Sequence, residues 1–155
     1  MNRRRRDEID ATYLKMALQW SKLSRARKKK VGAIIVKDGR IISDGFNGTP
    51  YGADNNCENV LEDGTLQTKE EVLHAESNAI TKLAASTQSS EGATLYLTLS
   101  PCMECAKLIL QSKIVEVVYI EKYRNEEPIK FLNTYVPVRQ MKIELINKLL
   151  GIEDE

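Results

Sequence analysis

The sequence lacks the features of several common classes of protein. Its 155 residues contain only three cysteines, one histidine and four prolines. An odd number of unevenly spaced cysteines excludes a closed disulfide framework and fits a reducing cytosol. No apolar run approaches the roughly 18 residues of a membrane-spanning helix, and no apolar signal segment follows the N-terminal arginines. We therefore expect a cytoplasmic protein that is neither inserted into a membrane nor secreted.

The composition is that of an ordinary folded domain. Hydrophobic residues make up 42% of the chain and charged residues 29%, far from the composition of disordered proteins. A chain of this length has room for one domain, which we predict to span residues 1–155. Within it we expect a basic tail over about residues 1–7 and a flexible end over about 150–155.

Charge is distributed unevenly along the chain, although the formal net charge is only +1. Residues 1–30 contain eleven lysines and arginines and three acidic residues, and the rest of the chain is correspondingly acidic. A basic segment of this kind attracts nucleic acid in some proteins and is merely solvated in others. The charge pattern alone does not decide between these two interpretations.

Hydrophobic periodicity predicts alternating helices and strands. Repeats of three and four residues predict a helix over about 8–23, and β-branched runs on either side of Asp38-Gly39 predict a hairpin. A long loop over about 45–68 follows, and the segment 138–150 is either strand or helix. Between them the pattern predicts helix, strand, helix, strand and helix over about 69–86, 93–99, 102–110, 114–120 and 126–134. This order indicates an α/β sheet with helical crossovers and ligands near the carboxyl ends of strands.

Two of the predicted helices begin near residues whose side chains could bind a metal or move protons. Ser100 suits a helix N-cap and Pro101 the first helical position. The capping-box pattern from Thr68 to Glu71 favours an early start for the helix over 69–86. Residues two apart inside a helix point about 200° apart, so His74 and Glu76 would not share a face there. The alternatives are a start near His74 or irregular geometry around it.

The chemistry is concentrated in the only histidine, His74, the nearby Glu76, and the pair Cys102 and Cys105. One imidazole and two thiolates hold Zn²⁺ with its fourth position open, which is typical of a catalytic site. The first turn of a helix favours the thiolate form that binds metal. We therefore predict one zinc ion per chain, with His74, Cys102 and Cys105 as ligands. Glu76 would not be a ligand but would move protons.

Several segments resemble the deoxycytidylate (dCMP) deaminases of the cytidine deaminase superfamily. His-x-Glu followed by Pro-Cys-x-x-Cys is shared by zinc-dependent nucleobase deaminases generally, so it specifies the reaction and not the substrate. The Asn-Gly-Thr-Pro loop and the Asn-x-Cys-Glu segment are similar to the dCMP branch. The resemblance covers about residues 8–135, and its segments are Val31-Gly-Ala-Ile, Gly45-Phe-Asn-Gly-Thr-Pro50, Asp54-Asn-Asn-Cys-Glu58, His74-Ala-Glu-Ser-Asn-Ala-Ile80, Thr98-Leu-Ser-Pro-Cys102 and Val118-Tyr-Ile-Glu-Lys-Tyr123.

This resemblance implies a fold, a reaction and partners. The fold is a three-layer α/β/α sheet of about five strands flanked by helices. The reaction replaces the C4 amine of dCMP with water, giving dUMP, the precursor of thymidylate, and ammonia. The implied assembly is a homo-oligomer, a hexamer in many members, with dCTP and Mg²⁺ as activator and dTTP as inhibitor. No nucleic-acid partner is expected. The alternative is a zinc deaminase, similar to tRNA adenosine deaminases, that acts on a base within RNA or single-stranded DNA.

Five further residues are candidates for contacts with the substrate. Asn47 and Thr49 offer an amide and a hydroxyl to the sugar, although an Asn-Gly pair also simply makes a turn. By similarity, Ser24 and Lys28 would contact the 5′-phosphate, unless the lysine is only solvated. Tyr123 would cover the base or the phosphate, and packing is its alternative role.

The effector site that the resemblance implies would include Phe46 and Gly48. Regulated members of the family have a Gly-Tyr-Asn-Gly segment, and this chain has phenylalanine in place of the tyrosine. Any effector contact through the tyrosine hydroxyl would therefore be missing. Cys57 has no neighbouring cysteine or second histidine with which to form another zinc site. We predict that it is a buried or unpaired thiol.

Overall fold

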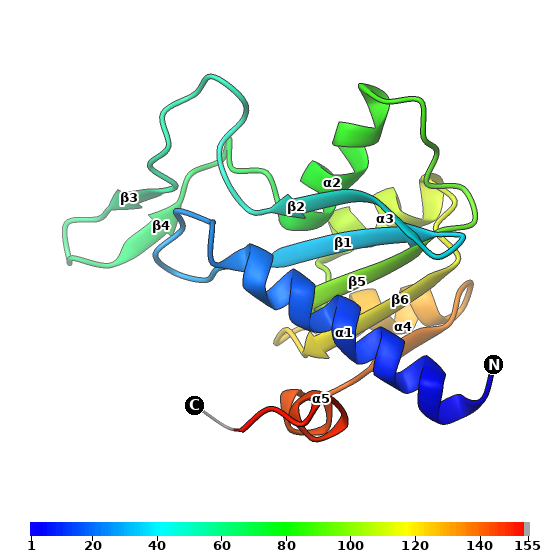
Figure 1. Ribbon diagram of the computed structural model, residues 1–155. Coiled ribbons are helices and arrows are strands. Elements are labelled where there is room, and N and C mark those ends of the chain that lie inside the picture. Colours follow the sequence, from blue (N-terminus) through cyan, green and yellow to red (C-terminus); the bar gives the residue numbers. More distant parts are fainter. Residues whose placement is uncertain (154–155) are drawn as a thin grey trace.

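The computed structural model of the protein describes residues 1–153 (Figure 1). No helix within these residues has the length and apolar content needed to cross a membrane. The helices are α1 (Arg3–Ser21), α2 (Ala75–Ala84), α3 (Met103–Gln111), α4 (Glu127–Asn133) and α5 (Ile143–Leu150). The strands are β1 (Gly32–Lys37), β2 (Arg40–Phe46), β3 (Glu58–Val60), β4 (Leu66–Thr68), β5 (Thr94–Leu99), β6 (Glu116–Glu121) and β7 (Val138–Gln140).

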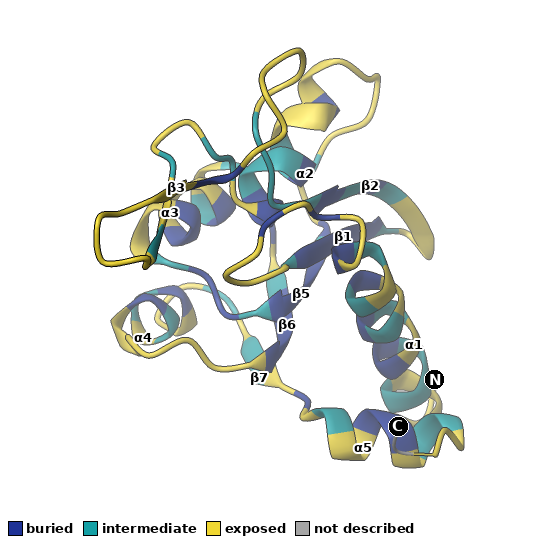
Figure 2. Ribbon diagram, turned by 90° about the vertical axis from the view of Figure 1, so that its left-hand side faces the viewer, coloured by how far each residue is buried: buried dark blue, intermediate teal, exposed yellow. Residues whose placement is uncertain are grey.

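The main sheet has five strands in the order β2-β1-β5-β6-β7. β1 is antiparallel to both β2 and β5, whereas β5, β6 and β7 are parallel to one another. The carboxyl ends of β2, β5 and β6 therefore lie at the same end of the sheet, where open α/β sheets bind ligands. Helices α1 and α5 cover one face, and α2, α3 and α4 cover the other (Figure 2). This arrangement confirms the predicted three-layer α/β/α fold.

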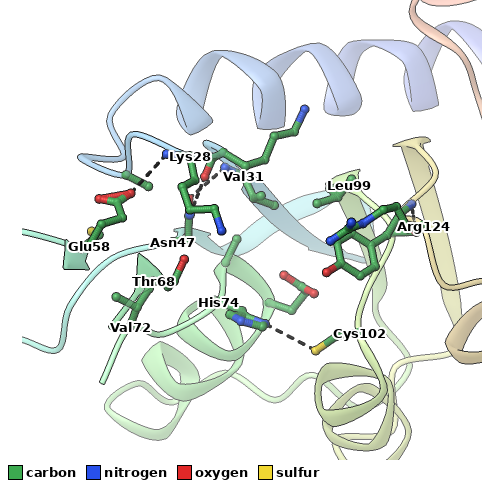
Figure 3. Close-up of a pocket in the computed structure, with 17 residues that line it drawn as sticks. Lys28, Val31, Asn47, Glu58, Thr68, Val72, His74, Leu99, Cys102 and Arg124 are labelled. Atoms are coloured by element: carbon green, nitrogen blue, oxygen red, sulfur yellow. Dashed lines mark hydrogen bonds between the residues drawn. The ribbon is translucent and has the colours of Figure 1, made fainter. Parts of the chain in front are cut away.

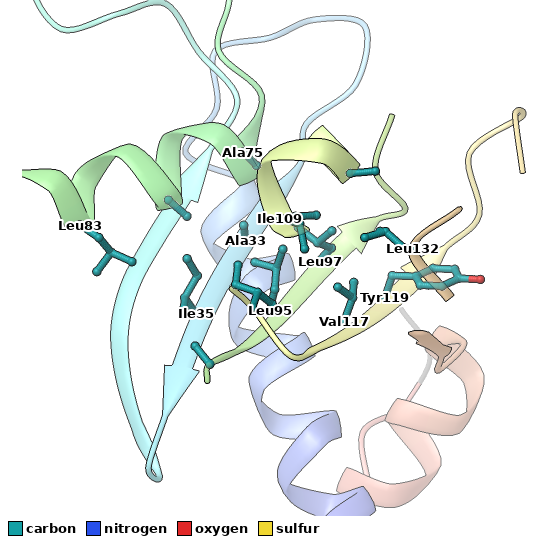
Figure 4. Close-up of a cluster of buried hydrophobic side chains, with 14 residues drawn as sticks. Ala33, Ile35, Ala75, Leu83, Leu95, Leu97, Ile109, Val117, Tyr119 and Leu132 are labelled. Atoms are coloured by element: carbon teal, nitrogen blue, oxygen red, sulfur yellow. The ribbon is translucent and has the colours of Figure 1, made fainter. Parts of the chain in front are cut away.

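Two apolar layers attach the helices to the sheet, because side chains alternate between its faces along each strand. Ile35, Leu95 and Leu97 pack beneath α2 and α3 together with Ile109 (Figure 4). The alternate residues of β1 and β5, together with two residues of β6, pack against α1 and α5, and these are Ile34, Val36, Tyr96, Val118 and Ile120. Each fully buried leucine or isoleucine contributes about 1.5–3 kcal/mol. The two layers hold the ends of α2 and α3 in place relative to the strands.

The first helix begins earlier than the apolar pattern predicts. α1 starts at Arg3 and not near residue 8, so much of the predicted basic tail is helical. The side chain of Asn2 accepts a hydrogen bond from the Arg5 amide at 2.9 Å. Glu8 forms ion pairs with Arg4 and Arg5 within the helix. A polar cap and pairs three or four residues apart stabilise a helical turn that has no apolar face.

The two helices at the candidate site begin later than the sequence pattern predicts. α2 begins at Ala75 with His74 as N-cap, so the early start is wrong and the start near His74 is right. α3 begins at Met103 with Cys102 as N-cap, so Ser100 and Pro101 precede the helix and do not start it. The Ser100 hydroxyl oxygen instead accepts a hydrogen bond from the Tyr123 amide at 2.7 Å.

The turns and loops differ from the predictions in two places. Asp38 and Gly39 have positive φ angles of 51° and 72°, as the predicted hairpin requires. The predicted long loop, however, contains the short hairpin of β3 and β4, which the sequence pattern did not indicate. The segment 138–150 contains both alternatives, strand β7 and then helix α5. The predicted flexible C-terminal end includes residues 154 and 155, which lie outside the described residues.

Helix α2 lies so close to β2 that only glycine fits at position 45. A Cβ atom at Gly45 would lie 2.5 Å from the Ala75 carbonyl oxygen and 2.7 Å from the Ala79 amide nitrogen. The Ser43 hydroxyl donates a hydrogen bond to the Ala79 carbonyl oxygen at 2.6 Å, which stabilises the same approach. The close packing sets the position of the N-terminus of α2, and therefore of His74.

We expect Gly45→Ala to lower the free energy of unfolding by roughly 1–3 kcal/mol, because the added methyl group overpacks the contact with α2. Urea-induced unfolding measures this change. Gly48→Ala is the matched control, since a Cβ there meets nothing within 4 Å. Its effect should stay within about 0.5 kcal/mol. Equal unfolding free energies for the two variants would contradict the role of Gly45.

Candidate metal and active site

The three predicted metal ligands converge where α2 and α3 begin. His74 and Cys102 are the N-caps of these helices, and Cys105 lies in the first turn of α3. The Nδ1 atom of His74 is 3.3 Å from the Cys105 sulfur and 3.5 Å from the Cys102 sulfur. All three candidate ligand atoms lie within 4.8 Å of one another. The fold therefore brings together residues that are up to 31 positions apart in the sequence.

This donor set fits a tetrahedral zinc ion. Zn–S bonds of about 2.3 Å and Zn–N bonds of about 2.0 Å place tetrahedral ligands roughly 3.5–3.8 Å apart. The sulfur–nitrogen distances of 3.3 and 3.5 Å are close to that range. Within residues 1–153, no cysteine or acidic residue joins these three side chains as a fourth member of the cluster. Cys105 is buried, whereas His74 is exposed, so the set is open on one side.

The three side chains affect one another's protonation through hydrogen bonds. Hydrogen bonds with Cys105 and then with His74 lower the pKa of the Cys102 thiol. The hydrogen bond with Cys102, followed by burial, raises the pKa of Cys105. The hydrogen bond with Cys102 also raises the pKa of His74. Metal ligands must be deprotonated, so a cation bound here would displace these protons.

Glu76 lies in the first turn of α2 and lines the same pocket as His74 and Cys102. Only 4% of its surface is exposed, and burial raises the pKa of its carboxyl group. His74 has an extended backbone conformation, with φ −73° and ψ 158°, because it precedes the helix. The geometric problem of two residues inside one helix therefore does not arise. A buried carboxyl beside a metal site is suited to accept and release a proton.

A pocket of about 310 Å³ adjoins the candidate ligands (Figure 3). Its volume lies at the small end of the range of small-molecule sites. Val31, Val72 and Leu99 give it apolar walls, while Asn47 and Thr68 add polar groups. It is also lined by three cationic residues, and these are Lys28, Lys29 and Arg124.

Three of the five predicted substrate contacts line this pocket, namely Asn47, Lys28 and Tyr123. The Asn47 amide also organises the backbone around it. Its oxygen accepts a hydrogen bond from the Val31 amide at 2.8 Å, and its nitrogen donates one to the Lys29 carbonyl oxygen at 2.8 Å. Asn47 thus lines the pocket and also fixes the loop before β1, so it does more than form the turn that an Asn-Gly pair predicts.

The other two predicted contacts, Ser24 and Thr49, are not among the residues that line the pocket. Ser24 is buried, and its hydroxyl donates to the Asn47 carbonyl oxygen at 2.7 Å. The same hydroxyl oxygen accepts a hydrogen bond from the Ala26 amide at 3.2 Å. The backbone of Thr49 forms a hydrogen bond with the thiol of Cys57. Both residues support the surrounding loops.

The predicted effector residues also lie outside the lining of this pocket. The ring of Phe46 packs edge-on against Trp20, with 6.1 Å between ring centroids. Gly48 and Leu73 exchange two backbone hydrogen bonds of 3.0 and 2.7 Å. This bridge joins the segment after β2 to the segment before α2, so Asn47 is held beside His74.

Sequence reasoning gave no role to two charged residues that line the pocket, Arg124 and Glu58, although it quoted Glu58 as the end of the Asn-x-Cys-Glu segment. Each is adjacent to a residue that was singled out, since Glu58 follows Cys57 and Arg124 follows Tyr123. The burial of these two side chains, and the direction in which each points, depend on tertiary structure, which no local sequence pattern reveals. Cys57 itself is buried and free, as predicted.

The sequence from residue 7 to residue 121 matches the family model described as the cytidine and deoxycytidylate deaminase zinc-binding region. The chain belongs to this family. It is 37% identical to the deoxycytidylate deaminase of Enterobacteria phage T4, over 76% of this chain and 80% of the relative. It is also 37% identical to the deoxycytidylate deaminase of Saccharomyces cerevisiae, over 87% of this chain and 45% of that longer protein.

Solved structures of the family share the fold. A dCMP deaminase from the cyanophage S-TIM5, in complex with dCMP and dUMP, is 43% identical to this chain, with a TM-score of 0.81. That similarity covers 91% of this chain and 99% of the cyanophage protein. A structure from a study of tRNA:A34 deaminases has 22% identity and a TM-score of 0.56, which shows a common fold only.

We expect His74→Ala to lose most of its zinc and to unfold at a lower temperature, because metal binding contributes to folding. Metal analysis of the purified variant and thermal unfolding measure the two effects. Thr81→Ala, an exposed change in the same helix, should keep one equivalent of zinc. One full equivalent of zinc in His74→Ala would exclude His74 as a ligand.

Proposed function

We propose that this protein deaminates dCMP to dUMP and ammonia with one zinc ion per chain, and so supplies dUMP for thymidylate synthesis. One observation carries the proposal: a buried carboxyl group lines the same pocket as His74 and Cys102, which form an open donor set with Cys105. Deoxycytidylate deaminases among the relatives, and the cyanophage enzyme in complex with dCMP and dUMP, support dCMP as the substrate.

The proposed mechanism assigns separate tasks to the ligands and to Glu76. When bound, zinc supplies the Lewis acidity that makes water nucleophilic near neutral pH. His74, Cys102 and Cys105 hold the ion and leave one position free. The Glu76 carboxylate accepts one proton from the attacking water and delivers it to a ring nitrogen. It then accepts the remaining hydroxyl proton and delivers it to the amine, which leaves as ammonia as the carbonyl bond forms. Burial suits this role because a raised pKa allows the carboxyl group to accept a proton and release it again near neutral pH.

The pocket lining suits a nucleotide with a flat base and an anionic end. Apolar side chains such as Val72 and Leu99 can pack against the base and exclude water. Of the lining cations, Lys29 forms an ion pair with Glu121 at 2.8 Å. Within the described residues, the charged groups of Lys28 and Arg124 have no ion-pair partner. In this proposal they receive the 5′-phosphate, with Tyr123 beside them.

The proposal also includes a homo-oligomer, a hexamer by family resemblance, and regulation by dCTP with Mg²⁺ and by dTTP. Phe46 offers no hydroxyl group, and its ring packs against Trp20. An effector would therefore have to be recognised by other groups than a hydroxyl at this position. Gly48 could contribute only its backbone, which is already bonded to Leu73.

The basic run at the start of α1 does not serve as a polynucleotide-binding surface beside the pocket in this proposal. The basic N-terminal run is engaged within the molecule, since Arg6 forms an ion pair with Glu116 at 2.9 Å. Glu8 similarly pairs with Arg4 and Arg5. The N-terminal end of α1 also lies at the far end of the sheet from the β3–β4 hairpin, which borders the pocket (Figure 1).

We expect Glu76→Gln to keep its zinc and its fold but to lose ammonia release from dCMP by about 10²-fold or more, because the proton carrier is gone. Zinc analysis and a coupled ammonia assay measure the two properties. Glu71→Gln provides a charge-matched control on the exposed segment before α2 and should retain activity. Normal turnover by Glu76→Gln would exclude it as the proton carrier.

We expect ammonia release from dCMP and none from short oligonucleotides containing cytosine or adenosine. A polynucleotide substrate would bind through many phosphates and weaken steeply with salt, whereas dCMP presents one phosphate group. Parallel assays at low and high salt measure both properties. Turnover of an oligonucleotide together with inert dCMP would replace the proposed substrate with a polynucleotide.

A further inference from the structure

The segment between α1 and β1, residues 22–31, contains six lysines and arginines and no acidic residue. We name this segment the basic loop. Ala26, Lys28, Lys29 and Val31 from this loop line one side of the pocket. Like charges repel one another at such short separations. The loop therefore needs anchors from other parts of the chain if it is to keep one conformation beside the pocket.

The anchor at the middle of the basic loop is the carboxylate of Glu58. One of its oxygens accepts a hydrogen bond from the Arg27 amide at 2.6 Å and another from the next amide, that of Lys28, at 3.2 Å. Figure 3 shows the bond from Lys28. Its other oxygen lies 3.6 Å from the Arg27 guanidinium and has no hydrogen bond. Glu58 is only 1% exposed. Successive backbone amides with a nearby guanidinium form an anion-binding arrangement, and here a side chain of the same protein occupies it.

Other anchors hold the two ends of the basic loop and leave its middle to Glu58. Ser24 bonds to the Asn47 carbonyl oxygen near the beginning of the loop. The Asn47 amide holds Lys29 and Val31 near its end. Arg27 and Lys28 lie between these anchors. Within residues 1–153, Glu58 is the only hydrogen-bond acceptor for their backbone amides.

We propose that Glu58 is a positioning residue for the phosphate of the substrate, because it fixes the backbone from which Lys28 reaches the pocket. Lys28 and Glu58 lie on one side of the pocket, with Arg124 across from them (Figure 3). The phosphate would bind between Lys28 and Arg124. The inference rests on the proposed function, since it takes a nucleoside monophosphate as the ligand.

Whether the removal of Glu58 weakens or strengthens nucleotide binding distinguishes a positioning role from a purely electrostatic one. A buried carboxylate in the pocket lining repels an anionic phosphate. If Glu58 acted only through its charge, its removal would strengthen the binding of dCMP and dUMP. If it positions Lys28, its removal weakens their binding, although the pocket becomes more positive. A purely structural role would lower stability or zinc content without a selective loss of nucleotide affinity.

The test compares the zinc-loaded variants Glu58→Gln, Glu58→Ala and Lys28→Met, and the double variant Glu58→Gln/Lys28→Met, with wild type. Calorimetry gives the dissociation constant of dUMP, and steady-state assays give kcat and KM for dCMP. Glu62→Gln is the matched control, because it removes an exposed negative charge from the β3–β4 hairpin without contact to the basic loop.

We expect Glu58→Ala to weaken dUMP binding about tenfold or more, the size of one lost charge-assisted contact. KM for dCMP should rise in parallel, with kcat and zinc content close to wild type. Glu58→Gln keeps an acceptor oxygen for the two amides and should lose less. The double variant should bind dUMP no more weakly than Lys28→Met, because both changes act on the same cation. Glu62→Gln should match wild type.

Three results would overturn the inference. Tighter dUMP binding by Glu58→Gln would show that only its charge matters, and additive losses in the double variant would show that Lys28 is not its target. Unchanged dUMP binding by the folded Glu58→Ala, together with unchanged amide hydrogen exchange in residues 25–31, would show that the basic loop does not depend on Glu58. Failure of wild type to turn over dCMP would instead refute the proposed function, while dUMP binding would still report on Glu58.

Discussion

The structure depends on the meeting of two helix N-termini at one end of a mixed sheet. His74 precedes α2 and Cys102 precedes α3, so each points its ligand atom into the space between the helices. This meeting requires α2 to lie almost directly on β2, which Gly45 permits. A shift of α2 by the width of one methyl group would separate His74 Nδ1 from both sulfurs. The close approach of backbone to backbone is therefore as important to the site as the ligands themselves.

The electrostatics of the site divide it into two functional parts. At its base, two thiols and an imidazole form a donor set that favours a cation, and the carboxyl group of Glu76 is buried in the lining of the same pocket. At its mouth, Lys28 and Arg124 favour an anion. The buried Glu58 lies between the backbone of the basic loop and the pocket, and it satisfies amides that would otherwise have no partner. A ligand with a polar base at one end and a phosphate at the other matches both parts.

The sequence allowed the layers of the fold and the chemical centre to be predicted, for different physical reasons. The apolar runs of β5 and β6 are strong because both faces of these strands are buried. The centre was predictable because His74, Cys102 and Cys105 are rare residue types at characteristic spacing. Helix starts were less predictable, since α1 is stabilised by Asn2 and ion pairs and not by an apolar face.

The walls of the pocket could not be derived from local pattern. Ser24 was expected at the substrate, but its hydroxyl is engaged with the backbone of Asn47. Glu58 lies on β3, within a hairpin that has no clear alternation of apolar residues, and its buried carboxylate bonds to the distant basic loop. The roles of Ser24 and Glu58 depend on contacts between segments 23 and 31 residues apart. Neither hydrophobic periodicity nor composition predicts such contacts.

The central claim is a zinc ion held by one nitrogen and two sulfurs, with its fourth position open beside Glu76. X-ray absorption at the zinc edge of the metal-loaded protein tests it most directly. The account predicts two sulfur ligands at about 2.3 Å and two nitrogen or oxygen ligands at about 2.0–2.1 Å, one from His74 and one from water. A third sulfur, which only Cys57 could supply, or a coordination shell without sulfur would contradict the account.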